Sequence, residues 1–84
     1  MEKIFVDTAA WLALLNKDDD LHRQAQQVMQ TLRRQHAALL TTEFVLLEVA
    51  DTLSAPAHRE RAVKFINGLR QLPLLTILPA SQSL

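Results

Sequence analysis

The chain has 84 residues, so it forms one small domain with a thin hydrophobic core. Hydrophobic residues make up 49% of it and glycine occurs once, a composition that excludes a disordered polymer. Nine Lys and Arg balance nine Asp and Glu, so no net charge recruits nucleic acid or a membrane, and the lack of Cys excludes disulfides and zinc-thiolate sites. Because the sequence has neither a signal-peptide pattern nor an apolar run near the roughly 18 residues of a membrane helix, we expect a cytoplasmic protein without membrane contact.

Strand and helix patterns alternate along the first half of the chain. Residues 3–6 are a short β-rich run, and residues 8–16 follow as an apolar helical pattern for which Thr8 is a plausible N-cap. Apolar residues then recur at helical spacing over 21–32, with Gln and Arg between them. This second pattern predicts an amphipathic helix capped by Asp20.

The second half of the chain repeats the order. Residues 37–41 read as a strand, 43–53 as a helix, and a further helix begins near Pro56. Residues 74–78 read as a third strand, and residues 80–84 look like the first turn of another helix. Strands separated by helices pair in parallel through right-handed crossovers, so the sequence predicts an α/β fold with the order βααβααβ.

Two acidic residues stand at positions where chemistry gathers in such folds. Asp7 ends the first strand, and Glu48 lies at the core boundary of the helix that follows the second strand. If the two strands are neighbours, both carboxylates face one pocket and suit Mg²⁺ or Mn²⁺, ions that activate water and neutralise a phosphodiester. The residue types alone leave another interpretation open, since Asp after a strand often caps a helix and a boundary Glu is often only solvated.

Several neighbouring side chains have two possible roles. Thr8 either orients the Asp7 carboxylate or a metal-bound water, or it caps a helix. Thr41 and Thr42 either line the pocket or cap the next helix, and for these two residues capping is favoured. Trp11 and Phe44 are expected in the core because Leu, Val and Ala surround them; exposed aromatic rings would instead stack on bases. The main group of basic residues consists of Arg59, Arg61, Lys64 and Arg70. We expect these residues to form a solvated face rather than to contact a phosphate backbone.

Two segments resemble PIN-domain proteins, especially the toxin ribonucleases of bacterial toxin-antitoxin pairs. Residues 4–14 read Ile-Phe-Val-Asp-Thr-Ala-Ala-Trp-Leu-Ala-Leu, and residues 40–50 read Leu-Thr-Thr-Glu-Phe-Val-Leu-Leu-Glu-Val-Ala. The resemblance implies a three-layer α/β/α fold with a parallel sheet, of which this chain holds the first three strands and their helices. It further implies that Asp7 and Glu48 are catalytic, metal-binding acids supported by Thr8, and that Mg²⁺ or Mn²⁺ assists hydrolysis of single-stranded RNA.

The same resemblance exposes a departure, because the family adds one or two Asp residues from a C-terminal half. After Glu48 the only acids are Asp51 and Glu60, and neither takes that role. We therefore expect residues 1–84 to form one PIN-like domain truncated at its C-terminus, with weak or no activity as an isolated monomer. An unpaired edge at the first strand would favour a homo-oligomer or a complementing chain.

Two other functions compete with a nuclease. One is a non-catalytic interaction module that self-associates or binds an antitoxin, which would tolerate replacement of Asp7 by Asn. The other is a receiver-like phosphoacceptor built on Asp7, which is disfavoured because no cluster of acids accompanies the first strand.

Overall fold

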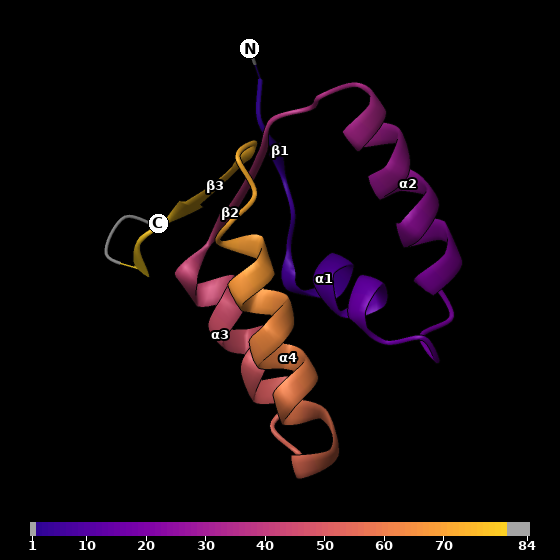
Figure 1. Cartoon of the computed structure of the whole chain (residues 1–84), viewed down its shortest axis with the longest axis vertical. Helices are drawn as coiled ribbons and strands as arrows, with labels where there is room; N and C mark the ends of the chain where they lie inside the picture. Colours follow the sequence, from indigo (N-terminus) through magenta and orange to yellow (C-terminus); the bar gives the residue numbers. More distant parts are fainter. Residues whose placement is uncertain (1, 81–84) are drawn as a thin grey trace.

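The computed structural model describes residues 2–80, and their secondary structure follows the predicted order βααβααβ (Figure 1). The elements are β1 (Ile4–Phe5), α1 (Thr8–Leu15), α2 (His22–Arg34), β2 (Leu39–Thr42), α3 (Glu43–Thr52), α4 (Pro56–Leu69) and β3 (Leu75–Leu78). Each observed boundary lies within two residues of its expectation. The further helix expected at the end of the chain lies almost entirely outside the described residues.

The three strands form one parallel sheet in the order β1-β2-β3, which confirms the α/β prediction. Ile4 pairs in register with Leu39, and Leu39 with Leu75, while the next row contains Phe5, Leu40 and Thr76. Successive residues of a strand point to opposite faces, so these two rows face opposite sides of the sheet. β2 is the central strand, and β1 and β3 are the two edges.

The helix starts differ from expectation in two places. Asp7, not Thr8, is the N-cap of α1, since its Oδ1 accepts a hydrogen bond from the amide of Ala10 at 3.0 Å. The prediction that Asp20 caps α2 is wrong as well: the N-cap is Leu21, which has no capping side-chain bond, and Asp19 instead accepts from the Leu21 amide at 2.8 Å. Each observed cap lies one residue from its expected position.

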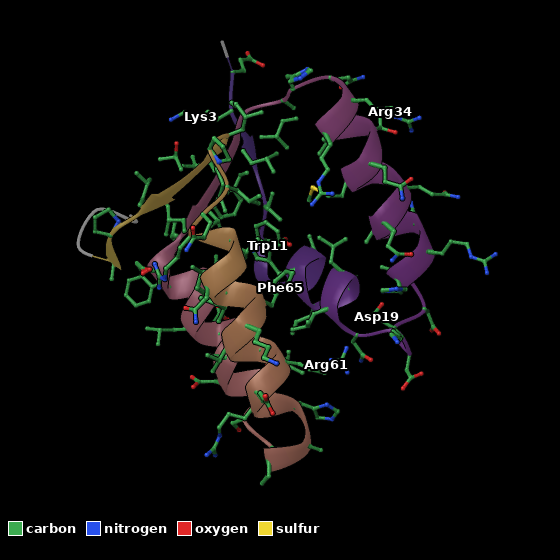
Figure 2. The ribbon with its side chains drawn as sticks, viewed as in Figure 1. Lys3, Trp11, Asp19, Arg34, Arg61 and Phe65 are labelled. Atoms are coloured by element: carbon green, nitrogen blue, oxygen red, sulfur yellow. The ribbon has the colours of Figure 1, made fainter. Side chains whose placement is uncertain are left out.

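The hydrophobic core lies between the Leu39–Leu75 face of the sheet and the helices. Its buried side chains come from β1, α1, β2, α3 and α4 and are Val6, Trp11, Leu39, Val45, Leu46, Val49 and Leu69. Trp11 is 1% exposed, and its ring meets the ring of Phe65 edge to face, with centroids 5.8 Å apart (Figure 2). The prediction that Trp11 belongs to the core is confirmed. Phe44 is the exception, since it is 53% exposed and the expectation that it is buried is wrong.

Helix α2 packs differently from the other helices. Figure 1 shows it beside α1, its main contact, and away from α3 and α4. None of its residues is buried, and Leu21 and Val28 on its apolar side are 57% and 52% exposed. His22 anchors its first turn, with Nδ1 lying 2.7 Å from the carbonyl of Ala13. None of the helices within residues 2–80 combines the length and apolar character that crossing a bilayer requires.

Candidate metal centre at the end of the sheet

Asp7 lies where the sequence predicted, directly after β1 at the carboxyl end of the sheet. The residue before it, Val6, is buried and hydrogen-bonded to β2, with its amide 2.8 Å from the carbonyl of Leu40. Asp7 itself is exposed, and capping of α1 employs only its Oδ1. The capping interpretation of Asp7 is therefore confirmed, and its carboxylate remains open to solvent.

Glu48 comes to the same end of the sheet from α3. Its Oε1 accepts a hydrogen bond of 3.2 Å from the hydroxyl of Thr8, a residue 40 positions earlier in the chain. Thr8 is the first residue of α1 and follows Asp7 in the chain, so this bond brings Glu48 to the residue next to Asp7. Both carboxylates are exposed.

A buried polar network holds the end of β1 in place. The hydroxyl of Thr41 donates to the carbonyl of Val6 at 2.9 Å and accepts from Nε1 of Trp11 at 3.1 Å. Thr41 is completely buried, so it neither lines the pocket nor caps a helix. Because Val6 precedes Asp7, the network fixes the backbone from which the carboxylate extends. Residue types alone could not reveal this role, which depends on a contact between β2 and α1.

The first turn of α3 holds a third acid, but it is already paired. Thr42 caps α3 by accepting from the amide of Val45 at 3.1 Å, as predicted. Glu43 lies 2.6 Å from Nη1 of Arg70 and accepts from Nη2 at 3.1 Å. The hydrogen bond from Arg70 lowers the pKa of Glu43 from its ordinary value, because it favours the charged carboxylate. This acid is committed to an ion pair with α4.

The two open carboxylates fit a hard divalent cation. Mg²⁺ typically takes one or two protein carboxylates and fills its remaining positions with water and substrate phosphate. Two exposed acids, one after a strand and one on a helix whose Glu48 bonds the residue next to Asp7, match that donor set. Within residues 2–80 no third Asp, Glu, His or Cys joins them to make a fuller ligand group.

The basic residues of α4 and its ends form hydrogen bonds or ion pairs within the chain. Arg61 donates to the carbonyl of Leu15 at 2.8 Å, Arg59 donates to that of Ser54 at 3.2 Å, and Lys64 pairs with Glu60. With Arg70 bound to Glu43, all four members of the basic group have a structural partner. The sequence favoured a solvated face for this group over contact with a phosphate backbone, and the structure adds an intrachain partner for each member.

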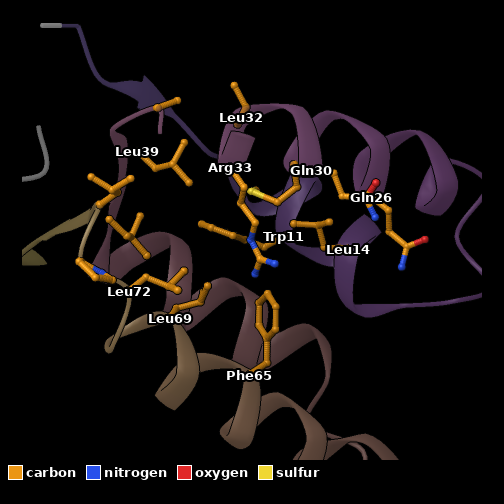
Figure 3. Close-up of a pocket in the computed structure, with 15 residues that line it drawn as sticks. Trp11, Leu14, Gln26, Gln30, Leu32, Arg33, Leu39, Phe65, Leu69 and Leu72 are labelled. Carbon is orange, nitrogen blue, oxygen red and sulfur yellow. The ribbon is translucent and has the colours of Figure 1, made fainter. Parts of the chain in front are cut away.

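Two apolar hollows border α1 and α2. The first, of about 420 Å³, lies between β1, α1 and α2 and includes Asp7 in its lining. We call it the β1 groove; its lining is Ile4, Phe5, Val6, Asp7, Ala9, Ala10, Ala13, Leu14, Leu21, Gln24, Ala25, Val28, Met29 and Leu32. The second, of about 400 Å³, lies between α1, α2, α4 and the start of β3 and includes none of the candidate metal-site residues (Figure 3).

Comparison with known proteins agrees with the fold. The structure of Mycobacterium tuberculosis VapC20, a toxin that cleaves the sarcin-ricin loop, superposes with a TM-score of 0.74 at 25% sequence identity. The match covers 95% of this chain but 58% of the VapC20 chain, so the present chain spans little more than half of that toxin. No curated protein sequence matches it significantly. The PIN-domain family model, however, matches residues 4–84, nearly the whole chain, and the protein therefore belongs to the PIN-domain family.

Proposed function

We propose that this chain is the N-terminal part of a toxin-type, metal-dependent endoribonuclease that cleaves single-stranded RNA in the cytoplasm. The observation that carries the proposal is the hydrogen bond from Thr8 to Glu48, which brings the acid of α3 to the residue that follows Asp7. Membership of the PIN-domain family and the likeness to VapC20, an RNA-cleaving toxin, support the same reading.

Each residue of the proposed centre has a distinct task. Asp7 and Glu48 hold the ion, and Thr8 orients Glu48 through its hydroxyl group. Mg²⁺ or Mn²⁺ bound there supplies an activated water and neutralises charge on the phosphodiester. Thr41 and Trp11 keep Asp7 in position by fixing the carbonyl of Val6.

Two carboxylates provide few ligands for arranging an in-line attack on a phosphodiester. We therefore expect slow cleavage by the 84-residue chain alone and faster cleavage when a second polypeptide contributes acids. The partners in this proposal are an RNA substrate, an antitoxin protein, and either a further copy of the chain or a complementing chain.

The test is cleavage of a fluorophore-quencher single-stranded RNA by the 84-residue chain with Mn²⁺ or Mg²⁺. We expect slow cleavage that ends with EDTA, with Asp7→Asn and with Glu48→Gln, because each treatment removes the ion or a ligand. Asp51→Asn is the matched control, since it removes an exposed acid from the same helix as Glu48 outside the proposed centre. Cleavage that survives both Asp7→Asn and EDTA would contradict the proposal.

A second candidate, a non-catalytic module that binds an antitoxin peptide, is favoured by the hollow in Figure 3. That hollow is mostly apolar, and the side chain of Arg33 reaches into it from α2 toward Trp11 and Phe65. Arg33 has no ion-pair partner within residues 2–80, so an apolar peptide with one carboxylate complements the site. Such a module binds equally well with Asp7→Asn and loses binding with Arg33→Gln, whereas the nuclease loses activity with Asp7→Asn.

A further inference from the structure

An aromatic ring lies exposed on the helix that carries Glu48. Phe44 is in the first turn of α3 and is 53% exposed, whereas Val45 and Leu46 beside it are buried. A phenyl ring left in water gives up much of the stabilisation that its burial would contribute. Phe44 is therefore a large apolar group that the core of residues 2–80 does not use.

Phe44 and Glu48 are neighbours on the surface of α3. They are four residues apart, so their side chains leave the same face of the helix one turn from each other, with Cβ atoms about 5–6 Å apart. Side chains of a helix tilt toward its N-terminus, which brings Glu48 over the turn that contains Phe44. Glu48 also bonds Thr8, the residue after Asp7. The ring is thus next to one acid of the proposed metal centre.

The surroundings of the ring separate it from the apolar hollows and from the basic group. Phe44 lines neither of the two hollows that border α1 and α2, so it is not part of a groove for an apolar peptide there. Arg70, the basic residue that reaches the first turn of α3, is bound to Glu43. At this end of α3, the metal centre supplies the cation for a phosphate, and the neutral ring remains for the rest of a nucleotide.

We propose that Phe44 is the platform on which an unpaired base of the RNA substrate stacks, beside the nucleotide whose phosphate reaches the metal centre. The inference rests on the proposed function for the identity of the strand, and it adds a reason why that strand is single. Every base has a π face, so stacking on one ring requires an unpaired base but no particular sequence. A base inside a duplex is already stacked between its neighbours and is not free to meet the ring.

A nucleotide has the two kinds of group that this surface complements. Its phosphate is an anion that fits a cation held by Asp7 and Glu48, and its base is a flat ring that fits Phe44. A protein partner would instead cover apolar side chains of either kind over a broad surface. Leu47, on the same exposed side of α3, is 56% exposed, so a protein interface would use Leu47 as much as Phe44. The two residues therefore distinguish a base from a protein.

The first measurement is the kinetics of oligoadenylate cleavage in Mn²⁺. Phe44→Leu keeps an apolar side chain but removes the π face, so it should raise KM by at least about fivefold and change kcat by less than about twofold. Phe44→Tyr keeps the ring and should hold KM within about twofold of that of the unchanged chain. Leu47→Ala is the matched control, since it removes an equally exposed apolar side chain next to Glu48 and should leave KM unchanged.

The second measurement does not depend on cleavage. Phe44→Trp keeps an aromatic face and adds an exposed fluorophore, whereas Trp11 is 1% exposed and shielded from RNA. Single-stranded oligoadenylate should quench the emission of the new indole saturably, and the same strand annealed to oligouridylate should bind at least about fivefold more weakly. Val63→Trp, at a site on α4 that is 52% exposed, is the control and should not respond.

Four outcomes overturn the base-stacking proposal. They are an unchanged KM for Phe44→Leu, an equal rise of KM for Leu47→Ala, emission of Phe44→Trp that RNA does not quench, and equal quenching by the duplex. Circular dichroism shows whether each variant is folded, as we expect for an exposed position.

Failure of the proposed function has a different signature. Saturable quenching of Phe44→Trp by a chain that does not cleave RNA would leave the base site standing and refute the nuclease. Quenching that is equal in Mn²⁺ and in EDTA would refute the metal centre alone, because a phosphate held by the ion should strengthen binding of the same strand.

Discussion

The two sides of α1 differ in how tightly they are packed. On one side, Trp11 belongs to a continuous core with residues of β2, α3 and α4, and its indole group donates to a buried threonine. On the other side, α2 contacts α1 but buries none of its own residues and leaves the apolar groove open. Asp7 lies at the border of the two regions, so a rigid core fixes its backbone while an open surface surrounds its carboxylate. A site that must be positioned and still admit substrate or partner requires both.

The largest expected effect is that of Trp11→Ala. Removal of this buried ring should lower the free energy of unfolding by about 3–5 kcal/mol, because it leaves a cavity beside Phe65 and deletes the bond to Thr41. Leu21→Ala, on the exposed apolar side of α2, is the matched change and should cost less than about 0.5 kcal/mol. Urea denaturation followed by circular dichroism measures both, and equal losses would show that α2 belongs to the same cooperative core.

The next effect isolates the polar network from the apolar packing. Thr41→Val keeps the shape of the side chain but leaves Nε1 of Trp11 and the carbonyl of Val6 buried without their partner, at a cost of about 1–3 kcal/mol. RNA cleavage should fall by more than the loss of folded protein explains, since the carbonyl before Asp7 is no longer fixed. Activity that follows the folded fraction alone would argue against a positioning role for Thr41.

Much of this rigid region was predictable from the sequence. Asp7 and Glu48 stood out because a carboxylate after a strand and one on the helix after a neighbouring strand lie near the same end of a parallel sheet. The order of elements followed from periodicity, and Thr42 followed from capping chemistry. These features depend on local sequence and on the general geometry of parallel sheets.

The features that were missed depend on contacts between distant elements. Thr41 looked like a cap or pocket residue, and only the approach of α1 to β2 shows that it bonds Trp11. Phe44 looked like a core residue because its neighbours are apolar, yet it lies on the exposed face of α3 while Val45 and Leu46 of the same turn are buried. The cap of α1 moved from Thr8 to Asp7 because two consecutive residues both suit that position. No periodicity argument distinguishes such cases.

Substitution of Asp7 separates its structural role from its proposed chemical one. Asp7→Ala removes the cap of α1 and should lower the free energy of unfolding by about 1 kcal/mol. Asp7→Asn keeps an oxygen that accepts from the Ala10 amide. It should therefore change the free energy of unfolding by only a few tenths of about 1 kcal/mol. Thermal denaturation of both variants beside the cleavage assay checks this. If Asp7→Asn is as unstable as Asp7→Ala, its loss of activity no longer identifies a metal ligand.

The smallest effect concerns the ion pair between α3 and α4. The hydrogen bond from Arg70 lowers the pKa of Glu43 below its ordinary value of 4.5, so the pair stabilises the fold above that pH and the stabilisation is lost as the pH falls through the pKa of the folded state. Half of Arg70 is exposed to solvent, so Glu43→Gln should cost only about 0.5 kcal/mol at pH 7. Urea denaturation at pH 7 and at pH 3 measures the difference between the two chains, which should shrink in acid and in 1 M salt.

Glu60→Gln is the control, because its pair with Lys64 is almost fully exposed and should show no such dependence. A pH-independent difference would mean that Glu43 stabilises the junction by packing, and that the ion pair does not contribute to holding α4 against the rigid side of the molecule.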